Sequence, residues 1–167
     1  MSMKKWLSAV LTGTMILGAM SFTAMADEEN YAENGIYYRE NVTRTESGFN
    51  EQNPPTCAYF CANGIPITID APTNPEMGAK ITWTYDGMEY SKEISKVSVV
   101  CGGGWDTSVA ATSITMNGGD VEYGVFGGGV KDTAIVTDSV NIVIKDGKLN
   151  DGVVGGGING AIGTAEK

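Results

Sequence analysis

The sequence predicts an all-β protein, built as a short parallel β-solenoid (β-helix) with an N-terminal β cap region. Three observations predict this class. Segments between residues 65 and 101 alternate apolar and polar side chains, which is the period of a β-strand. The triplet Gly-Gly-Gly occurs three times, at 102–104, 127–129 and 155–157. The stretches that end in these triplets resemble one another, and no sustained helical period follows residue 26.

The repeat is visible by direct alignment. MNGGDVEYGVFGGG, from Met116, lies over IKDGKLNDGVVGGG, from Ile144, without a gap and at an offset of 28 residues. Gly119 then falls on Gly147, and Cys101 takes the position of Phe126 in the preceding copy. A period in the twenties, with two short strands and glycine-bearing turns in each unit, is typical of a stacked solenoid.

The glycine triplets are predicted to be structural turn residues at the corners of the solenoid. Glycine at a corner allows positive φ, and it lets neighbouring coils approach at strand spacing without side-chain conflict. The apolar positions Val121, Val125, Leu149 and Val153 are expected to point inward and form ladders. The predicted turn glycines are Gly102, Gly103, Gly104, Gly127, Gly128, Gly129, Gly155, Gly156 and Gly157.

The N-terminus predicts export. Lys4 and Lys5 precede an apolar stretch, and Ala24-Met25-Ala26 supplies the small residues of a cleavage site, so residues 1–26 are predicted to be a signal peptide. We expect the mature chain to begin at Asp27 and to be extracellular or on the cell surface. The apolar stretch is too short and too mixed for a membrane span, so no membrane contact is expected after cleavage.

The rest of the chain divides into three predicted parts within one domain. Residues 27–56 form a polar leader or linker, with a short strand in GIYYRENVTR. Residues 57–96 form the β cap region, with a hairpin turn at Asp86-Gly87. Residues 97–167 contain the repeats, of which the last unit is incomplete.

Composition excludes several classes of function. Without Lys4 and Lys5, nine basic residues face 20 acidic ones, a net charge of −11, which disfavours nucleic acids and anionic membrane surfaces. The chain has no histidine, so catalysis by Ser-His-Asp or Cys-His groups and zinc sites built on histidine are excluded. None of the glycine triplets has the spacing of a dinucleotide-binding or phosphate-binding loop.

The three cysteines, Cys57, Cys61 and Cys101, make an odd count for an exported chain. Two alternatives stay open: one disulfide with one remaining thiol, or no disulfide. A bridge from Cys57 to Cys61 would need a turn between them, because a straight strand holds the two ends too far apart. Cys101 is expected to be a small buried apolar residue. We predict no metal site and no cofactor.

A glycan-binding or polysaccharide-lyase-like β-helix fragment is the alternative from another functional class. Its catalytic groove would need clustered carboxylates and a nearby cation, and aromatic rings could stack on sugars. The carboxylates do not recur at matching repeat positions, so we predict no catalytic residues and interpret these side chains as a solvated acidic face and packing residues. The candidates weighed are Asp106, Asp120, Glu122, Asp132 and Lys131, with Trp83, Trp105 and Tyr123 as stacking rings.

The segments ATSITMNGGDVEYGVFGGG and SVNIVIKDGKLNDGVVGGG resemble repeats of large adhesin-like surface proteins that gut Firmicutes export. The resemblance covers residues 57–163, about two-thirds of the chain. It implies a right-handed parallel β-helix, an extracellular location and an adhesive or scaffold role, with no catalytic residues. Proteins of this kind are usually far longer, which leaves a short relative and a truncated piece as alternatives.

These observations predict an exported, non-catalytic protein that contacts an extracellular glycan or protein. The last unit is followed only by INGAIGTAEK, which is too short and too poor in large side chains to cover an apolar end. We therefore expect self-association through the C-terminal end of the repeats.

Overall fold

The computed structural model describes residues 33–43 and 56–163, and every regular element among them is a β-strand. The all-β class is thus confirmed. No described segment forms a helix with the length and hydropathy needed to cross a membrane. The predicted signal peptide at 1–26 lies outside the described residues. The strands are β1 (Tyr37–Thr43), β2 (Thr56–Cys61), β3 (Ile67–Asp70), β4 (Ala79–Tyr85), β5 (Met88–Ile94), β6 (Ser98–Cys101), β7 (Val109–Met116), β8 (Asp120–Val121), β9 (Val125–Phe126), β10 (Val136–Ile144), β11 (Lys148–Leu149) and β12 (Val153–Val154).

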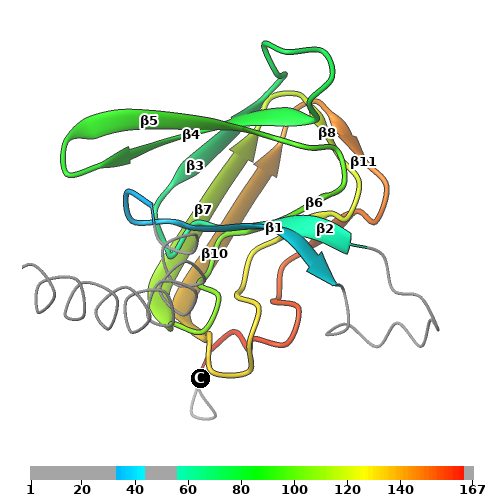
Figure 1. Cartoon of the computed structure of the whole chain (residues 1–167). Coiled ribbons are helices and arrows are strands. Elements are labelled where there is room, and N and C mark those ends of the chain that lie inside the picture. The colour runs from blue at the N-terminus through cyan, green and yellow to red at the C-terminus, as the bar shows by residue number, and fades with distance from the viewer. Residues whose placement is uncertain (1–32, 44–55, 164–167) are drawn as a thin grey trace, which may run out of the picture. The chain divides into compact units, whose positions relative to one another are not determined.

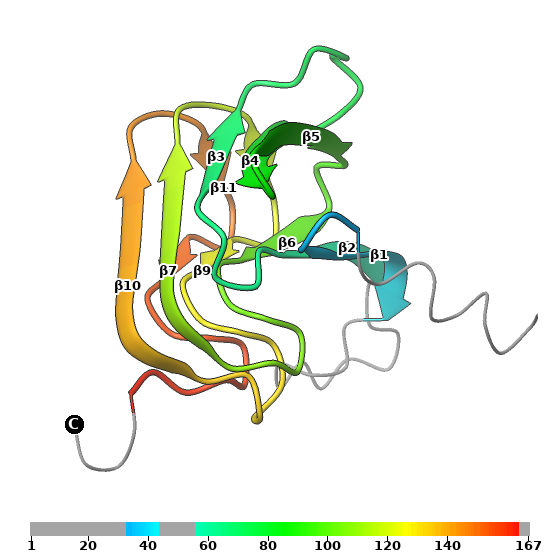
Figure 2. The same ribbon diagram turned by 90° about the vertical axis from the view of Figure 1, so that its left-hand side faces the viewer.

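The strands form three sheets (Figures 1 and 2). Sheet 1 has the order β1-β2-β6-β9-β12, and sheet 2 has the order β10-β7-β3-β4-β5. A two-stranded ribbon pairs β8 with β11. Consecutive strands of the chain alternate between sheets from β6 onward, so each glycine-bearing turn carries the chain from one sheet to the next.

The predicted right-handed parallel β-solenoid is wrong. Both large sheets are mixed: β1 pairs antiparallel with β2, and β3, β4 and β5 form an antiparallel run. Strands β2 and β3 of the N-terminal part pair edge to edge with the repeat strands β6 and β7. The repeat period predicts only how the repeated strands pair with one another. The strands outside the repeats pair antiparallel, so both five-stranded sheets are mixed.

Parallel pairing follows the offset of the aligned units. Val121 pairs with Leu149 and Val125 with Val153, each 28 positions apart. Cys101 pairs with Phe126, 25 positions apart. Equivalent residues of successive units therefore lie side by side in the sheets.

The main core lies between sheets 1 and 2. Phe60 and Val100 from sheet 1 pack in one buried cluster with Ile81 and Ile114 from sheet 2. Within sheet 1, strands β2 and β6 are buried on both faces, since every residue of β2 after the first and every residue of β6 is buried. Strands buried on both sides read as unbroken apolar runs, which explains the segment CAYFCA.

Two local predictions are confirmed. The turn between β4 and β5 is Asp86-Gly87, with φ of 50° and 76°, and it joins antiparallel strands. Two successive positive φ values match the twist of a two-residue hairpin. The short strand expected in GIYYRENVTR is β1, which forms the edge of sheet 1.

Candidate functional site

The outer face of sheet 2, which points away from the main core, carries a row of hydroxyl groups. Ser91 of β5 pairs with Thr82 of β4, Thr82 pairs with Thr68 of β3, and Thr68 pairs with Thr115 of β7. Neighbouring strands lie about 4.8 Å apart, so the four hydroxyls repeat at that spacing across the sheet. The row ends at Val143 of β10.

The alternation of β3 and β4 places these hydroxyls. Ile67 and Ile69 of β3 point into the core, as do Ile81 and Trp83 of β4, and the residues between them point outward. The sequences ITID and AKITWTY therefore put β-branched threonines on the exposed pleat, where they suit strand geometry and leave their hydroxyls facing solvent. The hydroxyls of Thr68 and Thr82 have no hydrogen bond to any residue in the described part of the chain.

An open hollow of about 410 Å³ lies on this face beside the hydroxyl row. Thr68 and Thr82 belong to both the row and the hollow, and Glu89 adds a carboxylate at its rim. Glu89 is the strand partner of Thr84, which also contributes a hydroxyl. Pro66 and Trp83 complete the lining. The hollow thus combines hydrogen-bond donors and acceptors with one negative charge.

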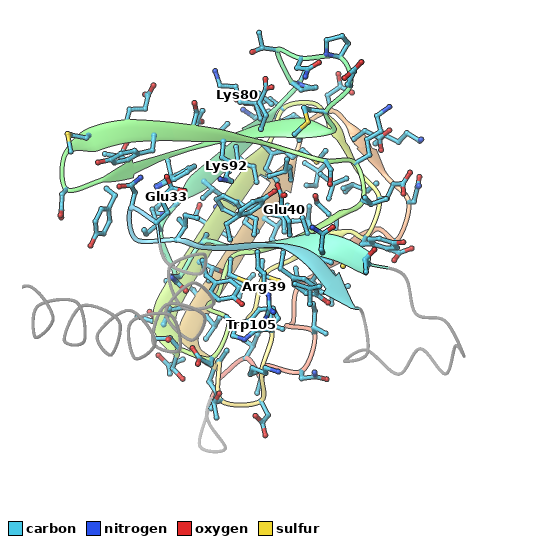
Figure 3. All side chains as sticks on the ribbon, viewed as in Figure 1. Glu33, Arg39, Glu40, Lys80, Lys92 and Trp105 are labelled. Carbon is cyan, nitrogen blue, oxygen red and sulfur yellow. The ribbon has the colours of Figure 1, made fainter. Side chains whose placement is uncertain are left out.

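Charged groups border the row on the same face. Lys80 pairs across strands with Glu93 on one side and Asp70 on the other, and Figure 3 shows Lys80 on the side of β4 away from Lys92. Glu93 accepts backbone N–H groups from Thr73 at 2.6 Å and Asn74 at 3.2 Å. The Thr73 N–H contributes most to holding the pKa of Glu93 below its ordinary value. This carboxylate is therefore occupied in ordering the loop before β4.

A second cluster of polar side chains is formed by Lys92, Glu33, Tyr38 and Glu40. Lys92 forms an ion pair with Glu33 at 3.6 Å (Figure 3). The Lys92 ammonium also lies 4.3 Å from the ring centre of Tyr38. The Tyr38 hydroxyl donates a 2.8 Å hydrogen bond to Glu40. Burial, and next the hydrogen bond to Glu40, raise the pKa of Tyr38 well above its usual value. These contacts link Lys92 of β5 to Tyr38 of β1 and to Glu33. They indicate a structural role for these side chains.

The carboxylates weighed as catalytic candidates do not form one site. Asp120 of β8 contacts Lys148 at 3.4 Å, which is an ordinary ion pair. Asp106 and Asp132 are exposed in the loops after β6 and β9. No group of three histidine, cysteine, aspartate or glutamate side chains in the described ranges is arranged to hold a metal ion.

The aromatic candidates are packing residues in the structure. Trp83 is buried, stacks on Tyr90 with ring centres 5.9 Å apart, and donates its indole N–H to the Asn34 carbonyl at 3.0 Å. Trp105 stacks on Tyr37 with ring centres 4.8 Å apart, and the Lys131 ammonium lies 5.2 Å from its ring centre. Tyr123 and Trp105 both cover the buried cluster on the outer side of sheet 1.

The glycine triplets stack on one another through their backbones. Gly103 donates its N–H to the carbonyl of Gly128 at 3.1 Å, which continues the pairing of β6 with β9. A Cβ placed on Gly103 would lie 2.6 Å from the nitrogen of Gly129, closer than real side chains approach. Close approach of adjacent units therefore requires glycine at this position.

The other reason given for the triplets, positive φ, is wrong. None of the nine triplet glycines has a left-handed φ. Positive φ occurs instead at Gly119 and Gly147, which have φ of 96° and 121° and occupy equivalent places before β8 and β11. Gly119 and Gly147 are aligned between the two units, and a glycine kept at the same place in both is the sequence signal for a left-handed turn.

Sequence reasoning also missed the outer face of sheet 2. Its signal is the threonine or serine that alternates with apolar residues, which is Thr68 in ITID, Thr82 and Thr84 in ITWTY, and Ser113 and Thr115 in SITM. The face assembles because β3 brings the antiparallel run β4-β5 beside the repeat strand β7. No protein-family model, curated protein or solved structure matches this chain.

Proposed function

We propose that this chain is an exported, non-catalytic adhesin-like or scaffold protein that contacts a glycan or a protein through the outer face of sheet 2. The observation that carries the proposal is the row Ser91–Thr82–Thr68–Thr115 beside the hollow at Glu89. Export rests on the predicted signal peptide at 1–26 and gives an extracellular or cell-surface location.

A regular row of hydroxyls suits a polymer whose own hydroxyl groups recur. Each threonine hydroxyl donates one hydrogen bond and accepts others, so it can pair with sugar hydroxyls or with a peptide backbone. The row lies on paired strands, which hold its spacing more rigidly than a loop would. Because the hollow is open, it favours the side of an extended chain over a small enclosed ligand. Glu89 would favour neutral or cationic groups at its rim.

Binding to immobilised polysaccharides and to a glycan array tests the proposal. Changing both Thr68 and Thr82 to valine removes two hydroxyls while keeping the β-branched shape. The double variant should fold normally and lose at least tenfold in affinity for any glycan that the wild-type chain binds. Thr56→Val is the matched control, because Thr56 is an exposed threonine on a strand of the other sheet.

Two outcomes would contradict the proposal. Equal affinity of the wild-type chain and the double variant for the bound glycan would remove sheet 2 as the contact surface. Release of unsaturated sugar products from an acidic polysaccharide, with or without calcium, would show a lyase activity and overturn the non-catalytic role.

A further inference from the structure

Cys61 and Cys101 are direct neighbours in sheet 1. Cys61 is the last residue of β2, Cys101 is the last residue of β6, and the two are register partners in a parallel pair. Both side chains lie in the buried cluster on the outer side of sheet 1, and both are fully buried. Their thiol groups lie within hydrogen-bonding distance of one another.

This geometry is compatible with a disulfide. Paired strands lie about 4.8 Å apart, and the Cα atoms of disulfide-linked cysteines usually lie about 4.4–6.8 Å apart. The side chains of register partners leave the same face of the sheet, so the two sulfur atoms can meet by rotation about χ1. The strands before these residues are already paired from Ala58 with Ser98 onward, so the bond would require no change of register.

The third cysteine is excluded as a partner by its position. Cys57 lies four residues before Cys61 on the same strand, at a distance of about 13 Å by the rise of an extended chain. Cys57 precedes Ala58, whose partner is Ser98, at the opposite end of β6 from Cys101. Among the three possible disulfide pairs, only Cys61 with Cys101 fits this geometry.

We propose that Cys61 and Cys101 form a disulfide that joins β2 to β6 when the chain folds in an oxidising compartment. The oxidant is a small disulfide of the glutathione class. One protein thiolate attacks a sulfur of the oxidant and releases one thiol, and the second protein thiolate then attacks the mixed disulfide and releases the other. The protein loses two electrons and two protons, and one oxidant molecule becomes two thiols. The proposal does not depend on the glycan-contact function.

Burial determines when the bond forms. Exchange needs a thiolate, and burial, followed by the hydrogen bond to Cys101, raises the pKa of Cys61 well above its usual value. The folded, reduced pair therefore reacts slowly, and the bond forms during folding, before the outer side of sheet 1 closes. Once formed, it is shielded from reductants by the same burial.

Refolding of the full chain tests the proposal. The reduced, denatured chain is diluted into a mixture of oxidised and reduced glutathione, and the folded fraction is denatured and alkylated for mass spectrometry. We expect one alkylated cysteine, Cys57, and a linked peptide pair that contains Cys61 and Cys101. The disulfide closes a loop of about 40 residues, so the oxidised chain should melt about 10 °C higher than the chain refolded under reductant.

Three variants assign the pair. Cys57→Ser should still form the bond and show no alkylated cysteine, whereas Cys61→Ser and Cys101→Ser should each show two. The wild-type chain and Cys57→Ser are sufficient to assign the disulfide to Cys61 and Cys101. The assignment therefore holds even if the other two variants fail to fold. Three alkylated cysteines in the folded wild-type chain, or a linkage through Cys57, would overturn the proposal.

Discussion

The backbone N–H of Gly128 donates a 3.0 Å hydrogen bond to the carbonyl of Gly156, the residue 28 positions later. The two glycines are the middle residues of successive triplets, yet their surroundings differ. A Cβ on Gly128 would lie 2.5 Å from the nitrogen of Gly157, whereas a Cβ on Gly156 would meet nothing closer than Val154 at 4.0 Å. The two triplets are identical in sequence, but neighbouring backbone crowds only the middle glycine of the earlier one.

Gly128→Ala should lower the free energy of unfolding by about 2–3 kcal/mol, because the new methyl group would displace a paired backbone. Gly156→Ala should change it by less than about 0.5 kcal/mol. Both changes replace the middle glycine of a triplet by alanine, so their effects on the unfolded chain cancel. Urea denaturation of the two variants measures the difference, and equal effects would contradict the stacking of the triplets.

Thr112 connects sheet 2 to the glycine turn that follows β9 of sheet 1 through a hydrogen bond. It is buried on β7 and donates its hydroxyl to the carbonyl of Gly127 at 2.8 Å. Thr112→Val keeps the side-chain shape and should cost about 1–2 kcal/mol, since the carbonyl loses this donor. Thr115→Val, on the outer face of the same strand, should cost little. Chemical denaturation of both variants tests this, and an equal cost would exclude this hydrogen bond as the cause.

Glu93 should make stability depend on pH. The pKa of Glu93 is lowered in the folded chain, so ionised Glu93 stabilises the fold. This contribution to the free energy of unfolding is complete above the ordinary glutamate pKa of about 4.3. The contribution is lost as pH falls from that value through the lower folded pKa. Thermal melts between pH 3 and pH 7 should show a smaller acid-dependent decrease for Glu93→Gln than for the wild-type chain. Parallel pH profiles of the two proteins would contradict the role of the Thr73 and Asn74 contacts.

The edge formed by β10, β11 and β12 should support self-association. Val143, Val153 and Val154 are 38–45% exposed there, and an edge strand offers unpaired backbone groups to a second copy. We expect the sedimentation coefficient to rise with protein concentration. Val143→Lys should weaken association by about tenfold or more, because a charge on an edge opposes strand addition.

Met88→Lys is the control for that experiment, since Met88 is 58% exposed beside the β4–β5 turn, at the other end of sheet 2. It should leave association unchanged. A monomer at all concentrations would show that this edge does not bind a second copy.

The sequence by itself determined the strand class and the local turns. Alternation in ITID and AKITWTY depends only on the two-residue period of a strand, and Asp86-Gly87 needs only local backbone freedom. The offset of 28 also follows from sequence, because like residues stack on like when repeated units pair in register. These features are set by interactions between near neighbours or between near-identical segments.

The tertiary structure decided how the non-repeated strands pair, and this overturned the solenoid. The Asp86-Gly87 turn predicts the antiparallel β4–β5 pair, but nothing local predicts that β3 pairs antiparallel with β4 and parallel with β7. The choice depends on core packing between residues far apart, such as Phe60 and Trp83, whose ring centres lie 5.5 Å apart. The same long-range pairing made the hydroxyl row on sheet 2 and brought Cys61 beside Cys101, because the register of distant strands is fixed only when the whole core closes.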